Sequence, residues 1–213
     1  MIKTILGGRY EILEEIGKGG MAYVYKARCV LLNRIVAVKV LRDDLEGGDE
    51  FLKRFNTEAQ AAASLTHQNI VSIFDVGEDN GKHYIVMEYV DGMQMNEWLS
   101  TQPAKDKRLC LSKELLKAIE YVHLTGIVHR DLKPSNIMVT RNGENIKLID
   151  FGLADNDHMA ILKQPAGTPR YMSPEQAFNS IPDIRNDIYS LGIILQSLLP
   201  EKAFKAIIAK CFL

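Results

Sequence analysis

The sequence predicts an α+β fold with two lobes, an N-terminal lobe with an antiparallel β-sheet and one helix, and a mainly helical C-terminal lobe. The first observation is that residues 10–90 consist mostly of short runs rich in β-branched and aromatic residues, with turn-forming residues between them. The second is that, after Gly92, apolar residues recur at helical spacing. A length of 213 residues is enough for one large domain or two small lobes.

Three strands are predicted near the start of the chain. Residues 10–16 and 23–28 flank a glycine cluster, as the two strands of a hairpin do. Residues 35–40 form a β-branched run, which predicts a third strand.

A helix and two further strands complete the predicted N-terminal lobe. Residues 51–65 are rich in alanine and carry apolar residues at the spacing of one helical face, which predicts the helix. Residues 70–76 and 83–88 are predicted strands, and the turn-forming residues 79–81 separate them.

The second half predicts helices and one hairpin. Residues 112–125 have apolar positions at helical spacing, and Gly126 is a typical helix stop. Residues 137–140 and 146–149 predict a hairpin around an Asn-Gly turn. Two apolar helices are then expected, at 187–199 and 201–211, with Pro200 between them.

Composition and charge exclude several classes of protein. The 26 basic and 27 acidic residues give a net charge of −1, which argues against a nucleic-acid binder. No apolar run approaches the roughly 20 residues of a membrane-spanning helix, and the first residues do not have the pattern of a secretory signal. The 3 cysteines are scattered, without the spacing of a metal site or a disulfide pattern. Reduced cysteines in a cytoplasmic protein are therefore expected.

The most informative string is His129-Arg130-Asp131-Leu132-Lys133-Pro134-Ser135-Asn136, followed by Asp150-Phe151-Gly152. An acid such as Asp131 can accept a proton from a hydroxyl group, and Asn136 and Asp150 offer the oxygen ligands that Mg²⁺ prefers. The string resembles the catalytic motifs of the eukaryotic-like (Hanks-type) serine/threonine protein kinase family. The resemblance runs from about Tyr10 to the last residue, and the glycine-rich loop is similar to that of bacterial members.

The resemblance implies a domain organisation. A protein kinase domain is expected over residues 10–213, after a short N-terminal extension of residues 1–9. Its N-terminal lobe would cover about 10–87, its hinge 88–92 and its C-terminal lobe about 93–213, with a ligand cleft between the lobes.

The resemblance also implies roles for the catalytic residues. Asp131 would orient the substrate hydroxyl and take up its proton, while Asn136 and Asp150 would hold Mg²⁺ or Mn²⁺ on the phosphates of ATP. Lys133 would contact the transferred phosphoryl group. A lysine at this position is typical of kinases that act on serine and threonine.

The glycine-rich segment 17–24 resembles the loop that covers the ATP phosphates, because glycine lets the backbone approach the phosphate oxygens closely. Ala22 stands where the family has its third glycine, and an ordinary hairpin turn is the alternative. The residues expected to bind ATP are Ile16, Gly17, Gly19, Gly20, Val24, Ala37, Lys39, Met87, Glu88 and Val90.

Lys39 lies in an apolar run, where a buried cation needs partners. By resemblance, its partners are the α- and β-phosphates of ATP and the carboxylate of Glu58. The alternative is a surface lysine with a solvated glutamate. In the hinge, Glu88 and Val90 would bind adenine through backbone groups, and Met87 would either guard the back of the pocket or be a plain core residue.

Residues 167–175 resemble the segment that docks the peptide substrate. Thr168 would bond to Asp131 and Lys133, which again suggests serine and threonine acceptors. This segment separates protein kinases from kinases that act on small molecules. Asp187 matches the aspartate that braces the backbone of the catalytic loop.

Two departures from the family stand out. Residues 151–167 contain no serine, threonine or tyrosine, so we expect no phosphorylation switch at the usual position. The C-terminal lobe is shortened, and the helix that normally docks substrates is missing between 199 and 201. The usual arginine partner of Glu175 is absent as well, so either Glu175 is more exposed than usual or Arg185 replaces that partner.

The sequence therefore favours a serine/threonine protein kinase that uses Mg-ATP and acts on protein substrates. One alternative is a catalytically weak or silent pseudokinase that serves as a nucleotide-binding interaction module, and a kinase acting on a small molecule is another. A homodimer is left open. The sequence does not identify the protein substrate, the upstream signal or the oligomeric state.

Overall fold

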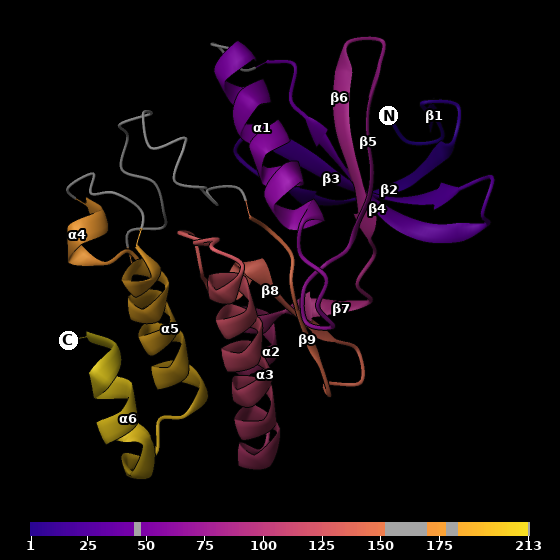
Figure 1. Ribbon diagram of the computed structural model, residues 1–213. Helices are drawn as coiled ribbons and strands as arrows, with labels where there is room; N and C mark the ends of the chain where they lie inside the picture. The colour runs from indigo at the N-terminus through magenta and orange to yellow at the C-terminus, as the bar shows by residue number, and fades with distance from the viewer. Residues whose placement is uncertain (45–47, 152–169, 178–182, 213) are drawn as a thin grey trace. The chain divides into compact units, whose positions relative to one another are not determined.

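Two units make up the chain in the computed structural model, which describes residues 1–44, 48–151, 170–177 and 183–212 (Figure 1). Unit 1 contains Met1–Ser64 and Val71–Val90. Unit 2 contains Leu65–Ile70 and Asp91–Leu213. The first unit is built on a β-sheet and the second is mainly helical, so the predicted α+β fold class is confirmed.

Unit 1 consists of a six-stranded antiparallel sheet and one long helix (Figure 1). The strand order is β1-β2-β3-β4-β6-β5. The strands are β1 (Ile5–Leu6), β2 (Tyr10–Lys18), β3 (Ala22–Cys29), β4 (Arg34–Leu41), β5 (Ile73–Asp79) and β6 (Lys82–Glu88), and the helix is α1 (Gly48–Ala63). The strands and the helix expected in this part of the sequence are thus present, with boundaries shifted by a few residues.

One face of the unit 1 sheet carries a hydrophobic core. Alternate residues of β4 point to it, as the two-residue period of a strand requires. The buried members include Ile12, Ala27, Val36, Val38, Val40 and Val86. Asn80 and Gly81 both have positive φ, 51° and 78°, which suits the two-residue turn between β5 and β6.

Part of the segment 1–9 also belongs to this sheet. The short strand β1 pairs with β2, and Leu6 is buried in the core. The backbone N–H of Gly7 donates a hydrogen bond of 2.9 Å to Asp79 Oδ2, which lies at the end of β5. The start of the chain is therefore held against two separate parts of unit 1.

Unit 2 contains a three-stranded sheet of order β7-β8-β9 and several helices. Helices α3 and α5 run side by side (Figure 1). The elements are β7 (Gly92–Gln94), α2 (Met95–Ser100), α3 (Lys105–Leu124), β8 (Ile137–Thr140), β9 (Ile146–Leu148), α4 (Pro174–Ala177), α5 (Ile184–Leu198), α6 (Lys205–Ala209) and 3₁₀ turns at Pro134–Asn136, Lys202–Phe204 and Lys210–Phe212.

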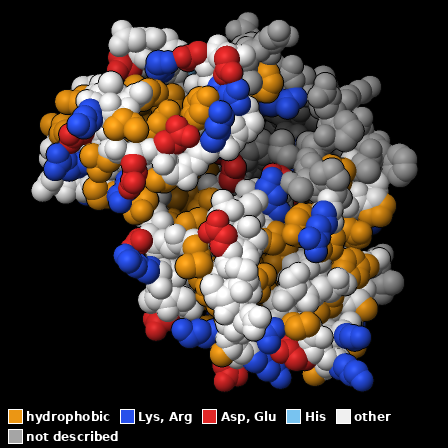
Figure 2. Space-filling model, turned by 180° about the vertical axis from the view of Figure 1, so that it is seen from behind, with side chains coloured by type: hydrophobic (Ala, Val, Ile, Leu, Met, Phe, Trp, Pro, Cys, Tyr) orange, Lys and Arg blue, Asp and Glu red, His pale blue; other side chains and the backbone are white. Residues whose placement is uncertain are grey.

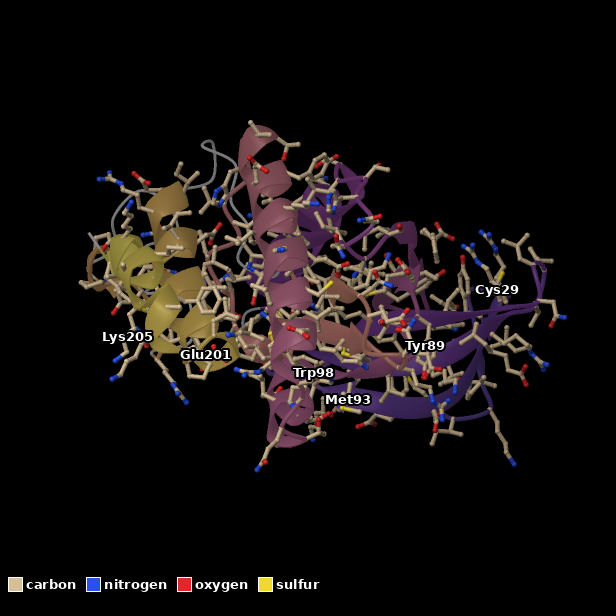
Figure 3. All side chains as sticks on the ribbon, turned by 90° about the horizontal axis from the view of Figure 1, so that it is seen from below. Cys29, Tyr89, Met93, Trp98, Glu201 and Lys205 are labelled. Atoms are coloured by element: carbon tan, nitrogen blue, oxygen red, sulfur yellow. The ribbon has the colours of Figure 1, made fainter. Side chains whose placement is uncertain are left out.

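Helix α3 starts earlier than the sequence predicts, at Lys105. Its core-facing positions form one buried stripe that includes Leu111, Leu115, Ile119 and Val122. The strand β7 and the helix α2 were not predicted at all. Their side chains are mixed in character, although Met95 and Trp98 of α2 are buried (Figure 3 labels Trp98).

The C-terminal part departs from the expected pair of helices. The helix predicted at 201–211 is divided into a 3₁₀ turn, the short helix α6 and another 3₁₀ turn. This segment packs closely on α5 at Gly192, where an added Cβ would lie 2.6 Å from Cys211 Cβ. Glu201, labelled in Figure 3, fixes the start of the segment by accepting a 2.8 Å hydrogen bond from Arg108 of α3.

The segment Leu65–Ile70 belongs to unit 2 although its neighbours in sequence belong to unit 1. Asn69 explains this, because its carbonyl oxygen accepts a hydrogen bond of 2.8 Å from the backbone N–H of Leu148. Its side-chain nitrogen also donates to the carbonyl of Ile146 at 3.0 Å. The strand predicted at 70–76 consequently begins only at Ile73.

Several surface and composition properties follow from the described residues. On the face shown in Figure 2, acidic and basic side chains are interspersed, in keeping with a net charge of −1. Among the described residues, no helix combines the length and apolar character needed to cross a membrane. All three cysteines are free, and Cys29, labelled in Figure 3, is buried in the unit 1 sheet.

Candidate active site

In unit 1, Lys39 of β4 and Glu58 of α1 form a buried ion pair. Lys39 Nζ lies 2.5 Å from Glu58 Oε1, and the two residues are only 8% and 6% exposed. The alternative of a surface lysine with a solvated glutamate is therefore wrong. Removing one partner of such a pair leaves a buried charge poorly compensated, so the two residues depend on each other.

The strand register gathers several expected ATP-binding residues on the same sheet face as Lys39. Val24 of β3 lies opposite Lys39, and Met87 of β6 lies opposite Ala37. Ala37 and Lys39 are two residues apart on β4, so all four share one face, while the hydrophobic core of the sheet lies on the other. Glu58 contacts Lys39, so this is the face that α1 approaches.

The glycine-rich segment forms the connection between β2 and β3. Gly17 lies opposite Val24, and the backbone N–H of Gly19 donates to the carbonyl of Ala22 at 2.8 Å. The register shifts between Glu15 and Gly17, so Ile16 lies at an irregularity of β2. The hairpin thus places Ile16 and the glycines next to the strand that faces Lys39.

Residues 87–90 end β6 and lead out of unit 1. Met87 is 7% exposed, so it is part of the packed interior. The backbone N–H of Glu88 donates to the carbonyl of Ser72 at 2.9 Å, which ties the end of β6 to the residue just before β5. Val90 is half-buried at the boundary of the unit.

In unit 2, the catalytic-loop string brings three predicted site residues together. Asp131 Oδ2 accepts a hydrogen bond from Lys133 Nζ at 2.6 Å. Asn136 Nδ2 donates to the backbone oxygen of Asp131 at 2.9 Å and to its Oδ2 at 3.3 Å. The 3₁₀ turn Pro134–Asn136 brings Asn136 back toward Asp131, five positions earlier in the sequence.

Asp150 reaches the same region through the β8–β9 hairpin. Ile137 pairs with Leu148, and the backbone N–H of Ile149 donates to the carbonyl of Asn136 at 3.1 Å. Asn136 and Asp150 therefore flank the same end of the hairpin. Asp150 is half-buried.

The donor set of these two residues fits a magnesium ion. Because the side-chain nitrogen of Asn136 donates to Asp131, its Oδ1 and the carboxylate oxygens of Asp150 are the atoms suited to a cation. The described residues contain no group of three or more His, Cys, Asp or Glu arranged for a metal. Mg²⁺ bound together with nucleotide phosphates does not need such a group, since one or two protein oxygens suffice.

Asp187 of α5 binds the backbone of the catalytic loop. This residue is fully buried, and its two carboxylate oxygens accept the backbone N–H groups of His129 and Arg130, each at 2.8 Å. His123 Nε2 lies 2.8 Å from Asp187 Oδ2. The ring of His129 packs on that of Phe151, with 4.8 Å between the ring centroids. The loop backbone is thus fixed by a buried carboxylate.

The two alternatives for Glu175 are resolved by its surroundings. Glu175 is exposed, and its Oε1 accepts a 3.2 Å hydrogen bond from Asn186. Arg185 pairs with Asp183 at 2.7 Å. The exposure of Glu175 fits the first alternative, while Arg185 forms its ion pair with Asp183.

Some expected features lie outside the described residues, and some observed ones were not predicted. Thr168 and the segment 152–167 belong to the first group. His123, Gln176 and Asn186 belong to the second, and all three bond to the catalytic loop, to Asp187 or to the segment around Ser173. In a single sequence they have no motif of their own, so only the fold reveals them.

This chain is similar in sequence to known proteins over most of its length. The family model described as "Protein kinase domain" matches residues 10–207. A probable serine/threonine-protein kinase of Clostridium perfringens is 44% identical over 204 residues, covering 93% of this chain and 30% of that protein. The serine/threonine-protein kinases PrkC of Bacillus subtilis and PknB of Mycolicibacterium smegmatis are 45% and 42% identical, covering 93% and 91% of this chain.

The chain spans only part of these relatives, 31% of PrkC and 33% of PknB. Over that part, the match includes nearly all of both units. The chain therefore belongs to the protein kinase family, and its relatives are bacterial Hanks-type serine/threonine kinases.

Proposed function

We propose that this chain transfers the γ-phosphoryl group of Mg-ATP, or of Mn-ATP, to serine and threonine hydroxyls of protein substrates. The observation that carries the proposal is the cluster of Asp131, Lys133 and Asn136 on a loop that Asp187 holds by two backbone hydrogen bonds. Phosphoryl transfer needs positioned charges more than covalent chemistry, and this cluster supplies them.

Asp131 acts as the base in this proposal. Its carboxylate orients the acceptor hydroxyl and takes up its proton as the oxygen attacks the γ-phosphorus, while the bond from that phosphorus to the bridging oxygen breaks and ADP leaves. Lys133, 2.6 Å from that carboxylate, stabilises the negative charge on the transferred group. Thr168 is proposed to bond to both residues, which favours serine and threonine acceptors over tyrosine.

The residues proposed to bind the nucleotide lie in unit 1, and those proposed to hold the metal lie in unit 2. Lys39, oriented by Glu58, binds the α- and β-phosphates. The backbone of Gly17, Gly19 and Gly20 approaches the phosphates. The adenine base is surrounded by apolar side chains, those of Ile16, Val24, Ala37 and Met87. Glu88 and Val90 bind the base through backbone groups. Asn136 and Asp150 would hold the metal, which would neutralise charge on the phosphates.

A catalytically weak or silent pseudokinase is the second candidate. The exposure of Glu175 favours it, because this residue closes the proposed peptide-docking segment and its carboxylate accepts a hydrogen bond from the neutral Asn186 side chain. Against it stand Lys39, Asp131, Asn136 and Asp150, all of which are present. The buried Lys39–Glu58 ion pair also fits a nucleotide site in which Glu58 orients Lys39 toward the phosphates of ATP.

Incubation of the chain with Mg-ATP and a generic protein, followed by phosphoamino-acid analysis, tests the proposal. Phosphoserine and phosphothreonine that disappear with Asp131→Asn support it. Nucleotide binding without transfer supports the pseudokinase, and transfer to a metabolite alone supports a small-molecule kinase.

We place the activity in the cytoplasm, which the free cysteines favour. Sedimentation of the chain tests for a homodimer.

A further inference from the structure

The backbone at Arg130 is strained immediately before the proposed base. Arg130 has φ = 64°, a value uncommon for a residue with a side chain. The N–H of Asp131 donates to the carbonyl of His129 at 2.9 Å, which closes a three-residue turn around Arg130. A turn of this kind with positive φ is rare and strained. The direction of Asp131 therefore depends on a peptide conformation that the chain would not adopt unaided.

Strain of this kind persists only where the surroundings impose it. The N–H of Arg130 is held by Asp187, as described above. The carbonyl of Arg130 is held by a second side chain, because Gln176 Nε2 donates to it at 2.7 Å. A carbonyl can only accept, so the nitrogen of the Gln176 amide must face it.

Gln176 is itself fixed in place. It is 3% exposed and belongs to α4, and its backbone N–H donates to Ser173 Oγ at 3.4 Å. Asn186 Nδ2 donates to the same Ser173 oxygen at 2.9 Å. Asn186 and Asp183 form the capping box of α5, so the support of Gln176 extends to a long helix.

We infer that Gln176 is a positioning residue for phosphoryl transfer, because its amide holds the Arg130 peptide in the left-handed conformation that aims Asp131. This inference rests on the proposed function. It also makes the segment around Ser173, where the peptide substrate is proposed to dock, a direct support of the catalytic loop. Gln176 touches no reacting atom in this proposal and acts only through Arg130.

Gln176→Met tests the inference, since methionine has a similar length and no N–H donor. We expect kcat to fall about tenfold while KM for ATP changes less than about twofold, because the ATP-binding residues are untouched. The backbone amide of Asp131 should exchange its hydrogen faster, which is measured without any substrate. Gln196→Met is the matched control, because Gln196 is exposed on α5.

A double-mutant cycle with Arg130→Gly separates this role from a general structural one. Glycine adopts positive φ without strain, so the turn no longer needs the bond from Gln176. In the Arg130→Gly background, Gln176→Met should lower kcat by less than about twofold. An equal loss in both backgrounds would contradict the inference, as would an unchanged kcat and amide exchange in Gln176→Met alone.

Melting curves and ATP affinity establish that each variant is folded. If Gln176→Met does not fold, Gln176→Glu replaces it, since the carboxylate is equal in size and cannot donate when ionised. An unchanged kcat and unchanged Asp131 exchange in that variant would overturn the inference. Absence of transfer by the unaltered chain would count against the proposed function, whereas Asp131 exchange would still decide whether Gln176 holds the turn.

Discussion

Lys39 Nζ and Glu58 Oε1 are 2.5 Å apart in the interior of unit 1, and the pair joins strand β4 to helix α1. The pair lies on the face of the sheet opposite the hydrophobic core. The pair links two elements of the fold. In the proposed function, it also orients the Lys39 ammonium group toward the phosphates of ATP. These two roles can be separated by mutation.

Lys39→Met should destabilise unit 1 by about 3 kcal/mol, because the carboxylate of Glu58 loses its cation in a buried site. The double variant Lys39→Met/Glu58→Leu should regain most of that stability and still fail to transfer phosphate. Urea denaturation and transfer rates measure the two effects. Recovery of transfer in the double variant would show that Lys39 has no role in aligning the phosphates.

Lys39→Met should also weaken transfer more than nucleotide binding, because other contacts continue to hold the nucleotide. Nucleotide affinity from titration calorimetry, compared with kcat for the same sample, measures the difference. Equal losses of affinity and kcat would indicate that Lys39 binds ATP without aligning it.

Asp150→Asn should abolish transfer and leave the fold intact. The change removes a charged oxygen ligand at the end of the β8–β9 hairpin without altering the size of the side chain. Melting temperature and transfer rate in the presence of Mg²⁺ or Mn²⁺ give the two readouts. Near-normal turnover would mean that Asp150 is not a metal ligand.

Asp183→Ala should destabilise the chain by about 1 kcal/mol, because Asp183 caps α5 by accepting the N–H of Arg185 at 2.8 Å. Asp183→Asn is the control, since asparagine also caps helices well. Denaturation of all three proteins at neutral pH makes the comparison. Equal losses in the two variants would show that the charge of Asp183, and not its capping bond, stabilises the helix.

The same residue predicts a pH dependence. The Arg185 side chain, and then its backbone N–H, lower the pKa of Asp183 from its ordinary value of 3.8. A carboxyl group with a lowered folded-state pKa stabilises the fold above its unfolded pKa, and this contribution is lost as the pH falls through the folded pKa. The stability advantage of the unaltered chain over Asp183→Asn should thus shrink below about pH 4. A constant difference between pH 7 and pH 3 would contradict this.

Phosphatase treatment should leave the transfer rate unchanged. Residues 151–167 contain no serine, threonine or tyrosine, so this segment offers no hydroxyl for a regulatory phosphate. The rate before and after treatment is the measurement, with a phosphorylated marker protein as the control for phosphatase activity. A large drop would place an activating phosphate elsewhere in the chain.

Much of the fold follows from local pattern. The strands of unit 1 are predictable because β-branched runs alternate with clear turns, and α5 because its apolar residues keep the helical period. The start of α3 is not, since its first turns carry charged residues and only the packed fold shows that they continue the helix. The strand β7 is only three residues long, too short for a periodic signal.

Some contacts of the candidate site can also be predicted from the sequence, and others cannot. Asp131, Lys133 and Asn136 form one short string, so their proximity is predictable from the sequence. The contact between Gln176 and Arg130 joins residues 46 positions apart, and it depends on how α4 and α5 pack. The exposure of Glu175 likewise depends on its neighbours in space and not on its neighbours in sequence.

Single-turnover transfer tests the central claim most directly. An excess of the chain is mixed with ATP labelled on its γ-phosphate, Mg²⁺ and a generic protein, and labelled phosphoserine and phosphothreonine are followed with time. We predict rapid transfer by the unaltered chain and a rate at least about 100-fold lower for Asp131→Asn, which should still bind Mg-ATP. Equal rates for the two proteins, or no transfer by a folded chain that binds Mg-ATP, would contradict the account.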